Sequence, residues 1–231
     1  MALKITLVRH GQSTGNAKEC FTGQTDVALS ELGQRQAELT AQVFAQEALT
    51  AIYSSDLQRA YITAETIAAC HKLPVNIDKR LREINLGIFQ GKSFTEIAEN
   101  YPQEYKAISR RDPDVVVPEG ESHGMVQSRV VKAFTEIISQ YTEGHILIVA
   151  HGGVIFHINH YVFGISPKDN FRVSYKISNC SINRYEFLAP ERWRLVSFND
   201  ESHLQSLNNK TNTPKLNSQF DNISEQIFGC S

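Results

Sequence analysis

The sequence has little of what marks a secreted, membrane-bound or nucleic-acid-binding protein. It holds four cysteines, Cys20, Cys70, Cys180 and Cys230, which lie far apart and form no C-x-x-C pair, so neither a zinc site nor a dense disulfide framework is indicated. Its 23 basic and 25 acidic residues give a formal net charge of −2, which leaves no basic surface for nucleic acid. No apolar run approaches the length that spans a bilayer, and residues 1–4 lead into a strand rather than a secretory signal. We therefore expect a soluble, cytoplasmic protein that binds neither nucleic acid nor membrane.

What the sequence does have is one pattern that occurs twice. Residues 5–8, Ile-Thr-Leu-Val, lead into Arg9, His10 and a glycine, and residues 146–150, Ile-Leu-Ile-Val-Ala, lead into His151 and two glycines. An apolar strand that ends in polar residues delivers their side chains to one edge of a sheet, and the glycines leave backbone N–H groups free to face an anion. The first stretch alone fits a purely structural ionic cluster equally well. Because the second stretch repeats the chemistry, we expect one shared phosphate site.

A further cation is expected near this site. A short apolar strand at 51–53 is followed by a Ser-Ser-Asp run at 54–56, which can cap a helix over about 57–71. Arg59 then lies in the first turn of that helix, where a cation opposes the helix dipole. An anionic ligand would explain the arrangement.

Five motifs resemble those of the histidine phosphatase superfamily, which contains the cofactor-dependent phosphoglycerate mutases. The motifs are Leu-Val-Arg-His-Gly at 7–11 with Ser13 and Asn16 behind it, Tyr-Ser-Ser-Asp-Leu-Gln-Arg-Ala at 53–60, Leu-Arg-Glu-Ile-Asn-Leu-Gly at 81–87, Gly-Glu-Ser at 120–122 and Val-Ala-His-Gly-Gly at 149–153. The resemblance implies an α/β fold, a three-layer αβα sandwich with a mostly parallel central sheet, helices on both faces and one antiparallel edge strand. The alternation of strands and helices along the chain independently favours such a sheet.

The resemblance also assigns roles to residues of this sequence. It implies that His10 is the nucleophile and Glu83 the proton donor, and that Arg9, Arg59 and His151 complete the catalytic set. Six further residues are implied to bind the substrate: Asn16, Thr22, Gly23, Gly152, Arg110 and Arg111. Without the resemblance, the Thr-Gly pair at 22–23 would fit an ordinary turn and the loop around Glu83 a solvated surface.

These residue types suit phosphoryl transfer, which needs cations on the phosphoryl oxygens, an in-line nucleophile and a proton for the leaving oxygen. Arginine stays charged and can fork onto two oxygens, which lysine cannot do with the same geometry. We expect the cations to lower the pKa of His10, and a backbone carbonyl near Gly11 to fix its tautomer. His151, if protonated, would instead donate to the phosphoryl oxygens. Glu83 is expected to hold its proton mainly in the substrate complex.

No metal or other cofactor is expected. The scheme requires none, and the chain has no cluster of carboxylates that would hold magnesium. His157 and His160 lie in one apolar helix, but no carboxylate or third histidine stands at a spacing suitable for zinc.

The expected domain covers residues 1–200. Within it, residues 88–121 contain an interrupted helical pattern and an extended connector, and we expect them to form a cap over the site. Residues 201–231 are rich in Asn, Ser, Gln, Lys and Thr, so we expect a polar tail that is mobile or loosely docked.

Two longer helices are expected within that domain from apolar residues at helical spacing. The first begins after Ser30 and is expected to bury Leu32, Leu39 and Val43. The second covers about 122–141 and is expected to bury Val126, Val130, Phe134, Ile137 and Ile138.

Within the superfamily the choice is between a phosphatase and a mutase. Arg110 and Arg111 resemble the arginine pair of the mutase insertion, but Leu86 and Phe94 stand where the mutase pattern has a tyrosine and a lysine. Gly-Glu-Ser at 120–122 is typical of the phosphatase branch. We therefore favour a metal-independent phosphomonoesterase that hydrolyses small phosphorylated metabolites through phosphohistidine. The alternatives are a cofactor-dependent phosphoglycerate mutase, an inactive phosphate-binding module and a metal-dependent phosphatase, and a homodimer is left open.

Overall fold

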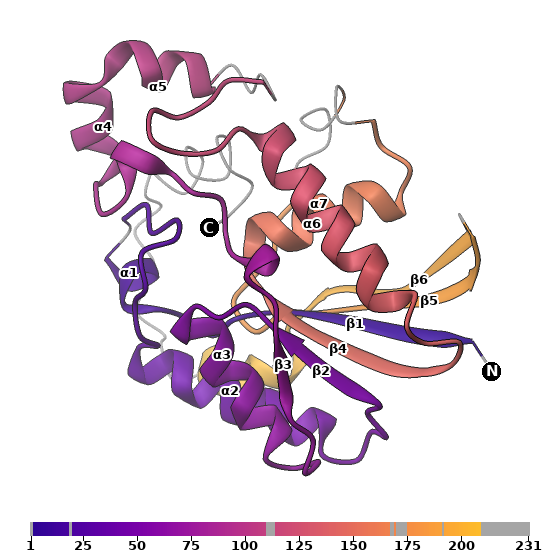
Figure 1. Ribbon diagram of the computed structural model, residues 1–231. Coiled ribbons are helices and arrows are strands. Elements are labelled where there is room, and N and C mark those ends of the chain that lie inside the picture. The colour runs from indigo at the N-terminus through magenta and orange to yellow at the C-terminus, as the bar shows by residue number, and fades with distance from the viewer. Residues whose placement is uncertain are drawn as a thin grey trace.

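A six-stranded sheet forms the centre of the molecule, and helices cover both of its faces (Figure 1). The computed structural model describes residues 2–18, 20–109, 114–166, 169, 175–190 and 192–208. In chain order the elements are β1 (Leu3–Arg9), α1 (Thr14–Ala17), α2 (Glu31–Phe44), β2 (Ala51–Ser54), α3 (Gln58–Ala68), β3 (Val75–Ile77), η1 (Lys79–Leu81), η2 (Gly87–Phe89), α4 (Phe94–Asn100), α5 (Pro102–Ser109), α6 (His123–Ile138), β4 (Gly144–Ala150), α7 (Gly152–Val162), β5 (Ile182–Ala189), β6 (Arg192–Asp200), η4 (Ser202–Leu204) and α8 (Gln205–Asn208). The strand order across the sheet is β3-β2-β4-β1-β5-β6.

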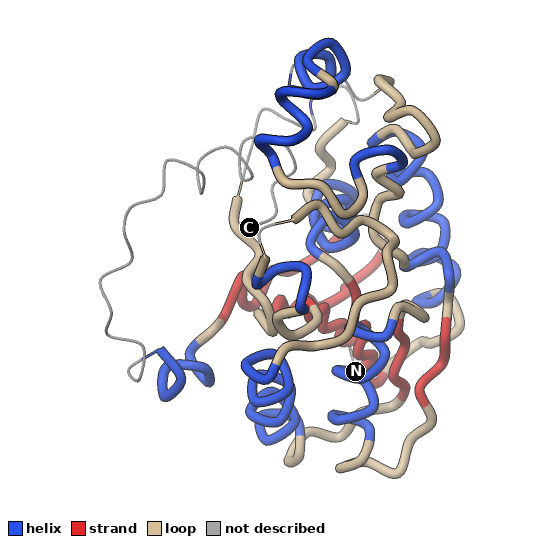
Figure 2. The backbone as a smooth tube through the Cα atoms, turned by 90° about the vertical axis from the view of Figure 1, so that its left-hand side faces the viewer, coloured by secondary structure: helices blue, strands red, loops and turns tan. Residues whose placement is uncertain are grey.

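The two faces of the sheet carry separate hydrophobic cores, because side chains alternate along each strand. In β4, Ile146 and Ile148 belong to the core that α6 and α7 cover, whereas Leu147 and Val149 belong to the core that α2 and α3 cover. Figure 2, turned by 90°, shows the strands lying between these helices. The three-layer αβα sandwich expected from the sequence is therefore confirmed.

The strand directions correct one detail of that expectation. β1, β2, β3 and β4 pair in parallel, and β5 is antiparallel to both of its neighbours, β1 and β6. The antiparallel strand thus lies one place in from the edge, and the edge strand β6 runs in the same direction as the parallel strands. The connection from Ala189 to Arg192 is the reason, because so short a turn can join only antiparallel neighbours.

α2 begins after the Ser30 cap, as expected, but its buried face was predicted only in part: Val43 packs against the α2/α3 core, whereas Leu32 does not. Its buried residues are Gly33, Ala37, Thr40, Ala41 and Phe44, and Leu32 is 36% exposed. A Cβ atom added at Gly33 would lie 1.9 Å from the carbonyl oxygen of Gln12. The helix therefore packs close against the loop after β1 through small residues, which a search for large apolar side chains overlooks.

The segment proposed as a cap contains α4 and α5, which project at the upper left of Figure 1. α4 begins at a capping box in which Ser93 and Glu96 satisfy each other's backbone N–H groups. Ile97 and Val117 anchor the segment in the α6/α7 core. A role of this segment as a cap over a ligand stays a prediction.

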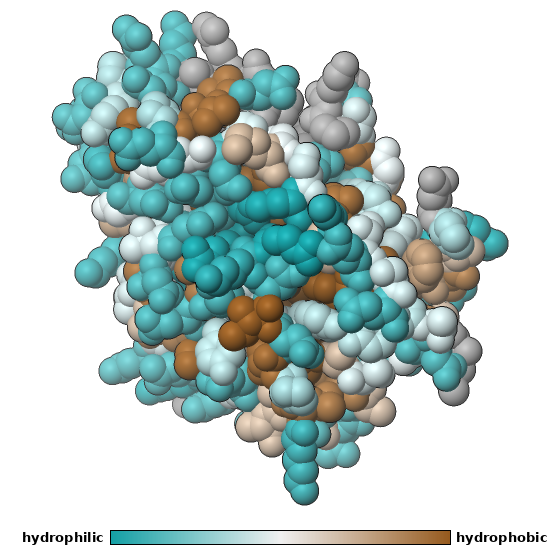
Figure 3. All heavy atoms as spheres, in the orientation of Figure 1, coloured by the Kyte–Doolittle hydropathy of each residue, from teal (hydrophilic) through white to brown (hydrophobic). Residues whose placement is uncertain are grey.

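The face shown in Figure 3 has strongly hydrophilic side chains in its middle, over η1 and α6. Ion pairs in this region join Arg80 to Asp78 and Glu136, and Arg82 to Asp56. Across the described ranges, no helix is long and apolar enough to cross a membrane.

The beginning of the predicted tail packs on the domain. Leu204 in η4 is 3% exposed, and Nε2 of His203 lies 3.0 Å from Oγ1 of Thr40 in α2. Residues 209–231 lie outside the described residues.

Candidate active site

His10 lies directly after β1, at the carboxyl edge of the parallel strands. Its N–H donates to the carbonyl of Ala150 at the end of β4, at 2.9 Å. Its own carbonyl accepts Nδ2 of Asn179 at 3.0 Å. The side chain is 4% exposed, so the backbone on both sides of a buried imidazole is fixed by hydrogen bonds.

The hydrogen bonds of the His10 ring identify its tautomer. Nδ1 lies 2.7 Å from the carbonyl oxygen of Gly11, and since a carbonyl can only accept, Nδ1 carries the proton. Nε2 is then bare, and it accepts Nε of Arg59 at 3.3 Å. Burial, reinforced by Arg59 and Arg9, holds the pKa of His10 well below its usual range. The ring is therefore neutral at pH 7, with a lone pair on Nε2, and the carbonyl expected near Gly11 is present.

Arg59 comes from the first turn of α3, and the loop at 23–26 holds it there. Its Nη1 and Nη2 donate to the carbonyls of Thr25 at 2.9 Å and Gly23 at 2.7 Å. Asp26 in the same loop caps α3 by accepting the N–H of Gln58 at 2.8 Å. The expected Ser-Ser-Asp cap is thus replaced by a carboxylate from a distant loop, and the helix N-cap, Leu57, has no side-chain cap of its own.

The site concentrates positive charge in a buried place. Burial lowers the pKa of Arg59 to about 10, so the guanidinium stays charged at neutral pH, and it forms no ion pair within the described residues. Arg9 is 3% exposed, and its Nη1 donates to the carbonyl of Ile177 at 2.5 Å. Two buried guanidinium groups beside one imidazole favour an anionic ligand.

His151 is the N-cap residue of α7 and directly follows β4. Its ring centroid lies 5.1 Å from that of His10, with the planes at 60°. The residue is fully buried, and neither ring nitrogen has a hydrogen-bond partner in the part of the chain that the structure describes. Burial, then Arg59, His10 and Arg9, hold the pKa of His151 well below its usual range. A ring that is held neutral still has one N–H to donate.

Glu83 reaches the site from the loop between η1 and η2. Its Oε1 accepts the N–H of Ile84 at 2.9 Å, and its Oε2 accepts the N–H of Gly153 at 3.1 Å. A Cβ atom at position 153 would lie 2.3 Å from Oε1. Gly153 is therefore needed for the carboxyl group to approach α7, a role that the sequence did not suggest.

The predicted substrate-binding residues are brought together in part. Asn16 in α1 forms a capping box with Ser13 through its Oδ1, while its Nδ2 has no partner among the residues described. Gly152 begins α7 beside His151, where helix N–H groups face the site. Arg110 and Arg111 lie outside the described residues.

Thr22 and Gly23 form part of the frame around Arg59. Gly23 has φ +51, and a Cβ there would lie 2.5 Å from Oε1 of Gln90, so only glycine allows its carbonyl to meet Arg59 without strain. The Thr22 hydroxyl donates to the carbonyl of Cys20 at 3.3 Å. These contacts show a framework role for both residues, and direct substrate contact stays a prediction.

Sequence reasoning missed several residues that support the site. Thr63 Oγ1 accepts the N–H of Gly11 at 3.1 Å, and Gln24 Nε2 donates to the Glu83 carbonyl at 3.0 Å. Arg129 donates to the same carbonyl at 2.9 Å. Only the short distance of Gln24 from the Thr-Gly pair could have drawn attention to it, and nothing in the sequence distinguishes Arg129 from the other charges of its helix.

The described residues contain no cluster that could act as a metal centre. No group of three His, Cys, Asp or Glu side chains that could hold a metal ion occurs over the described ranges. His157 packs against His123, with Nε2 3.4 Å from Nδ1 of the partner ring.

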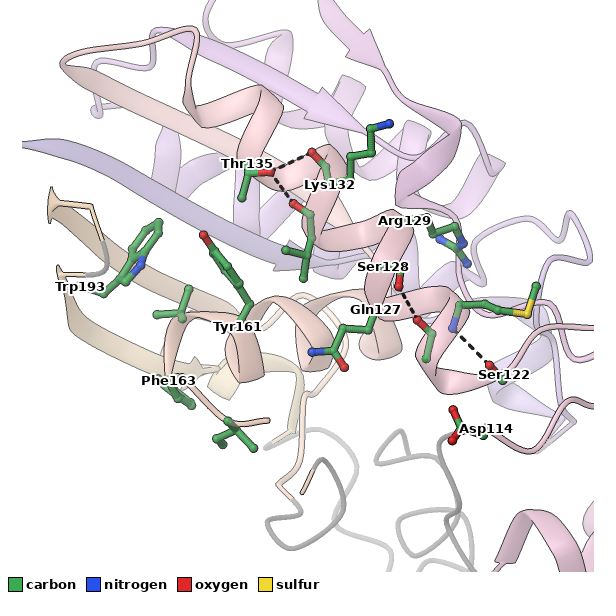
Figure 4. A pocket seen from close by; sticks show the side chains of 16 residues that line it. Asp114, Ser122, Gln127, Ser128, Arg129, Lys132, Thr135, Tyr161, Phe163 and Trp193 are labelled. Atoms are coloured by element: carbon green, nitrogen blue, oxygen red, sulfur yellow. Dashed lines mark hydrogen bonds between the residues drawn. The ribbon is translucent and has the colours of Figure 1, made fainter. Parts of the chain in front are cut away.

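A groove of about 1460 Å³ lies along α6 and the end of α7 (Figure 4). Tyr161, Phe163 and Trp193 line its apolar side. None of the described residues that line it is a predicted site residue.

Comparisons with known proteins agree with this architecture. The sequence model of the histidine phosphatase superfamily (branch 1) matches residues 5–201. Phosphoglycerate mutase-like protein 4 of Arabidopsis thaliana is 36% identical over 205 residues, which cover 87% of this chain and 87% of that protein. A probable phosphoglycerate mutase of Yersinia enterocolitica is 31% identical over 206 residues, covering 87% of this chain and 95% of that protein. The structure of a mycobacterial glucosyl-3-phosphoglycerate phosphatase shares 30% identity and a TM-score of 0.77, covering 86% of this chain and 99% of that one.

Proposed function

The chain belongs to branch 1 of the histidine phosphatase superfamily, and from this membership we propose that it is a metal-independent phosphomonoesterase that acts on small phosphorylated metabolites. His10 is the nucleophile in this proposal, Glu83 the proton donor, and Arg9, Arg59 and His151 bind the phosphoryl oxygens.

The observation that carries the proposal is the bare Nε2 of His10. The Gly11 carbonyl holds the proton on Nδ1 at 2.7 Å, and Nε2 faces the Arg59 guanidinium at 3.3 Å. A phosphoryl group drawn to that guanidinium is therefore drawn to the nucleophilic atom. Supporting it, the two ring nitrogens of His151 lack partners within the described residues, which suits a ring that donates to an oxygen of the ligand.

In the first step, Nε2 attacks phosphorus and the phosphorus–oxygen ester bond breaks. The leaving oxygen takes the proton of Glu83, so an alcohol departs and a phosphohistidine remains. The two guanidinium groups balance the charge on the equatorial oxygens, the part that electrostatic stabilisation plays in phosphoryl transfer. No metal is needed for that purpose.

In the second step, the Glu83 carboxylate takes a proton from water, and the water oxygen attacks phosphorus. The nitrogen–phosphorus bond breaks, and its electron pair returns to Nε2. Phosphate is released, and His10 and protonated Glu83 are restored for the next cycle.

The phosphatase is favoured over the mutase by Leu86 and Phe94, which replace the tyrosine and lysine of the mutase pattern, and by Gly-Glu-Ser at 120–122. The similar structure of the mycobacterial glucosyl-3-phosphoglycerate phosphatase supports the same choice. The mutase stays the second candidate because both curated relatives named above carry mutase names. Since phosphoglycerates occur in the names of both kinds of relative, 3-phosphoglycerate is the first natural substrate to test.

The test is phosphate release from p-nitrophenyl phosphate, glycerol phosphate and 3-phosphoglycerate with excess chelator, using His10→Ala as the control. Release by the unaltered protein that is absent in the control supports the proposal, as does acid-labile label on the protein from radiolabelled substrate. Conversion of 3- to 2-phosphoglycerate in the presence of bisphosphoglycerate, with little release, would establish the mutase instead. Substrate binding with neither label nor release would indicate an inactive phosphate-binding module.

A further inference from the structure

Arg129 on α6 uses all five of its N–H groups in contacts with other residues. Nε and Nη2 donate to the two carboxylate oxygens of Glu121 at 2.7 and 2.8 Å. Nη1 donates to the carbonyls of Arg80 and Arg82 at 2.8 and 2.7 Å, and Nη2 donates to the carbonyl of Glu83 at 2.9 Å. One guanidinium group therefore holds three backbone carbonyls of the loop that carries the proposed proton donor.

That loop has no regular structure of its own around Glu83. η1 ends at Leu81, and no helix or strand follows until η2 begins at Gly87. Carbonyl groups in such a segment need partners from elsewhere in the molecule. Arg129 provides such partners for the carbonyls of Arg82 and Glu83. Two residues after Glu83, the N–H of Asn85 donates to Oε2 of Glu121 at 2.8 Å.

The Arg129–Glu121 pair is partly buried, with side-chain exposures of 20% and 16%. Burial by itself would raise the pKa of Glu121, but hydrogen bonds from Arg129 and from the Asn85 N–H lower the pKa overall. Glu121 is therefore a carboxylate at neutral pH, and charge-assisted hydrogen bonds are about twice as strong as neutral ones. In Figure 4, Arg129 lies at the end of the groove away from Trp193 and Tyr161.

We propose that Arg129, held by Glu121, is a positioning residue for the proton donor. It fixes the backbone of Glu83 so that the carboxyl group stays beside the N–H of Gly153. The inference rests on the proposed function, in which the proton of Glu83 moves to the ester oxygen as the phosphorus–oxygen bond breaks. Arg129 acts through Glu83 alone and takes no part in the transfer.

A comparison of leaving groups separates this role from a general effect on stability. p-Nitrophenolate is a stable anion that leaves without a proton, whereas the alkoxide of glycerol phosphate needs one. Glu83→Gln also removes the base of the second step, which both substrates share, so the comparison uses kcat/KM, which covers only the steps up to phosphohistidine. Glu83→Gln should reduce kcat/KM for glycerol phosphate much more than for p-nitrophenyl phosphate. Arg129→Gln should do the same, with a selective loss of about 10- to 100-fold, since a loosened acid forfeits part of the 10²–10⁴ that general acid catalysis contributes.

Arg184→Gln is the matched control. Arg184 on β5 pairs with Glu47, and the two side chains are 24% and 28% exposed, so this variant also breaks a partly buried ion pair. It should leave the ratio of the kcat/KM values for the two substrates unchanged. Arg129→Lys, which keeps the charge but has only three N–H groups, should show a smaller selective loss than Arg129→Gln.

The double variant Glu83→Gln/Arg129→Gln completes the test. If Arg129 acts through Glu83, the double variant has the same ratio of the two kcat/KM values as Glu83→Gln alone. If the losses of activity add in the double variant, or if Arg129→Gln loses activity equally on both substrates, the positioning role is overturned and the proposed function stays intact. Failure of the unaltered protein to release phosphate from either substrate would overturn both.

Discussion

Replacing Gly153 by alanine should disable the proton donor without unfolding the protein. The new Cβ would lie 2.3 Å from Oε1 of Glu83, where ordinary contact begins at 3.4 Å, so the carboxyl group has to move by about 1 Å. A displacement of that size lowers a rate on the order of 100-fold. The fold should tolerate it, because the atom in the way is the end of a flexible side chain. Alanine is also favoured over glycine in a helix by about 0.5–1 kcal/mol.

The assay pairs kcat for glycerol phosphate with the thermal unfolding midpoint followed by circular dichroism. Gly153→Ala should lower kcat by about 100-fold at an unchanged or slightly raised Tm. Gly33→Ala is an informative contrast, because its Cβ would lie 1.9 Å from the carbonyl oxygen of Gln12, and backbone cannot swing aside. The Tm of Gly33→Ala should therefore be lower than that of the unaltered protein. An unchanged kcat in Gly153→Ala at an unchanged Tm would refute the role of Glu83 as proton donor.

Three further predictions concern the Arg59 side chain, the buried histidines and the need for a metal ion. Arg59→Lys should lower kcat/KM for p-nitrophenyl phosphate by roughly 10²–10³, because one ammonium cannot replace the bonds to Gly23 and Thr25 and also fork onto the phosphoryl group; equal kcat/KM values would contradict this. Burial holds the pKa values of His10, His151 and His157 well below the usual range, whereas in the unfolded chain the rings titrate near pH 6.5. Below that pH the unfolded state binds more protons than the folded state. The contribution of these rings to the free energy of unfolding should therefore be complete above about pH 7 and fall as the pH drops from about 7 to 5. Urea unfolding at each pH measures this free energy, and a profile that does not change with pH would show that the rings are not held neutral. Excess chelator should leave phosphate release unchanged, and a loss restored by magnesium would instead indicate a metal-dependent phosphatase.

The sequence predicted best the parts of the site that end strands. His10 and His151 were expected together, and they meet because β1 and β4 pair in parallel with Arg9 opposite Ala150. Alternation and strand direction determine which residues reach the carboxyl edge of a sheet. The inward stripe of α6 was also expected, and Val126, Val130 and Phe134 are buried.

Contacts between distant loops could not be predicted in the same way. Nothing in the spacing of residues shows that Asp26 caps α3, or that Arg129 holds the carbonyls of residues 80, 82 and 83. Such bonds join side chains to backbone across turns and have no period. The prediction of which residues α2 buries was incomplete for a related reason. Close packing at that face selects small residues rather than large apolar ones.

The position of β1 in the sheet has a consequence for synthesis of the chain. β1 is made first, but its two neighbours are β4, whose register places Gly144 beside Leu3, and β5, which places Phe187 beside Leu3. A strand whose Ile5, Leu7 and Val8 are fully buried in the finished sheet therefore leaves the ribosome long before either partner exists. Folding of the core has to wait for these long-range pairings, which are slow to form and leave apolar strand surface open to aggregation. Because His151 follows β4, a ligand of the proposed site can stabilise the chain only after that stage is over.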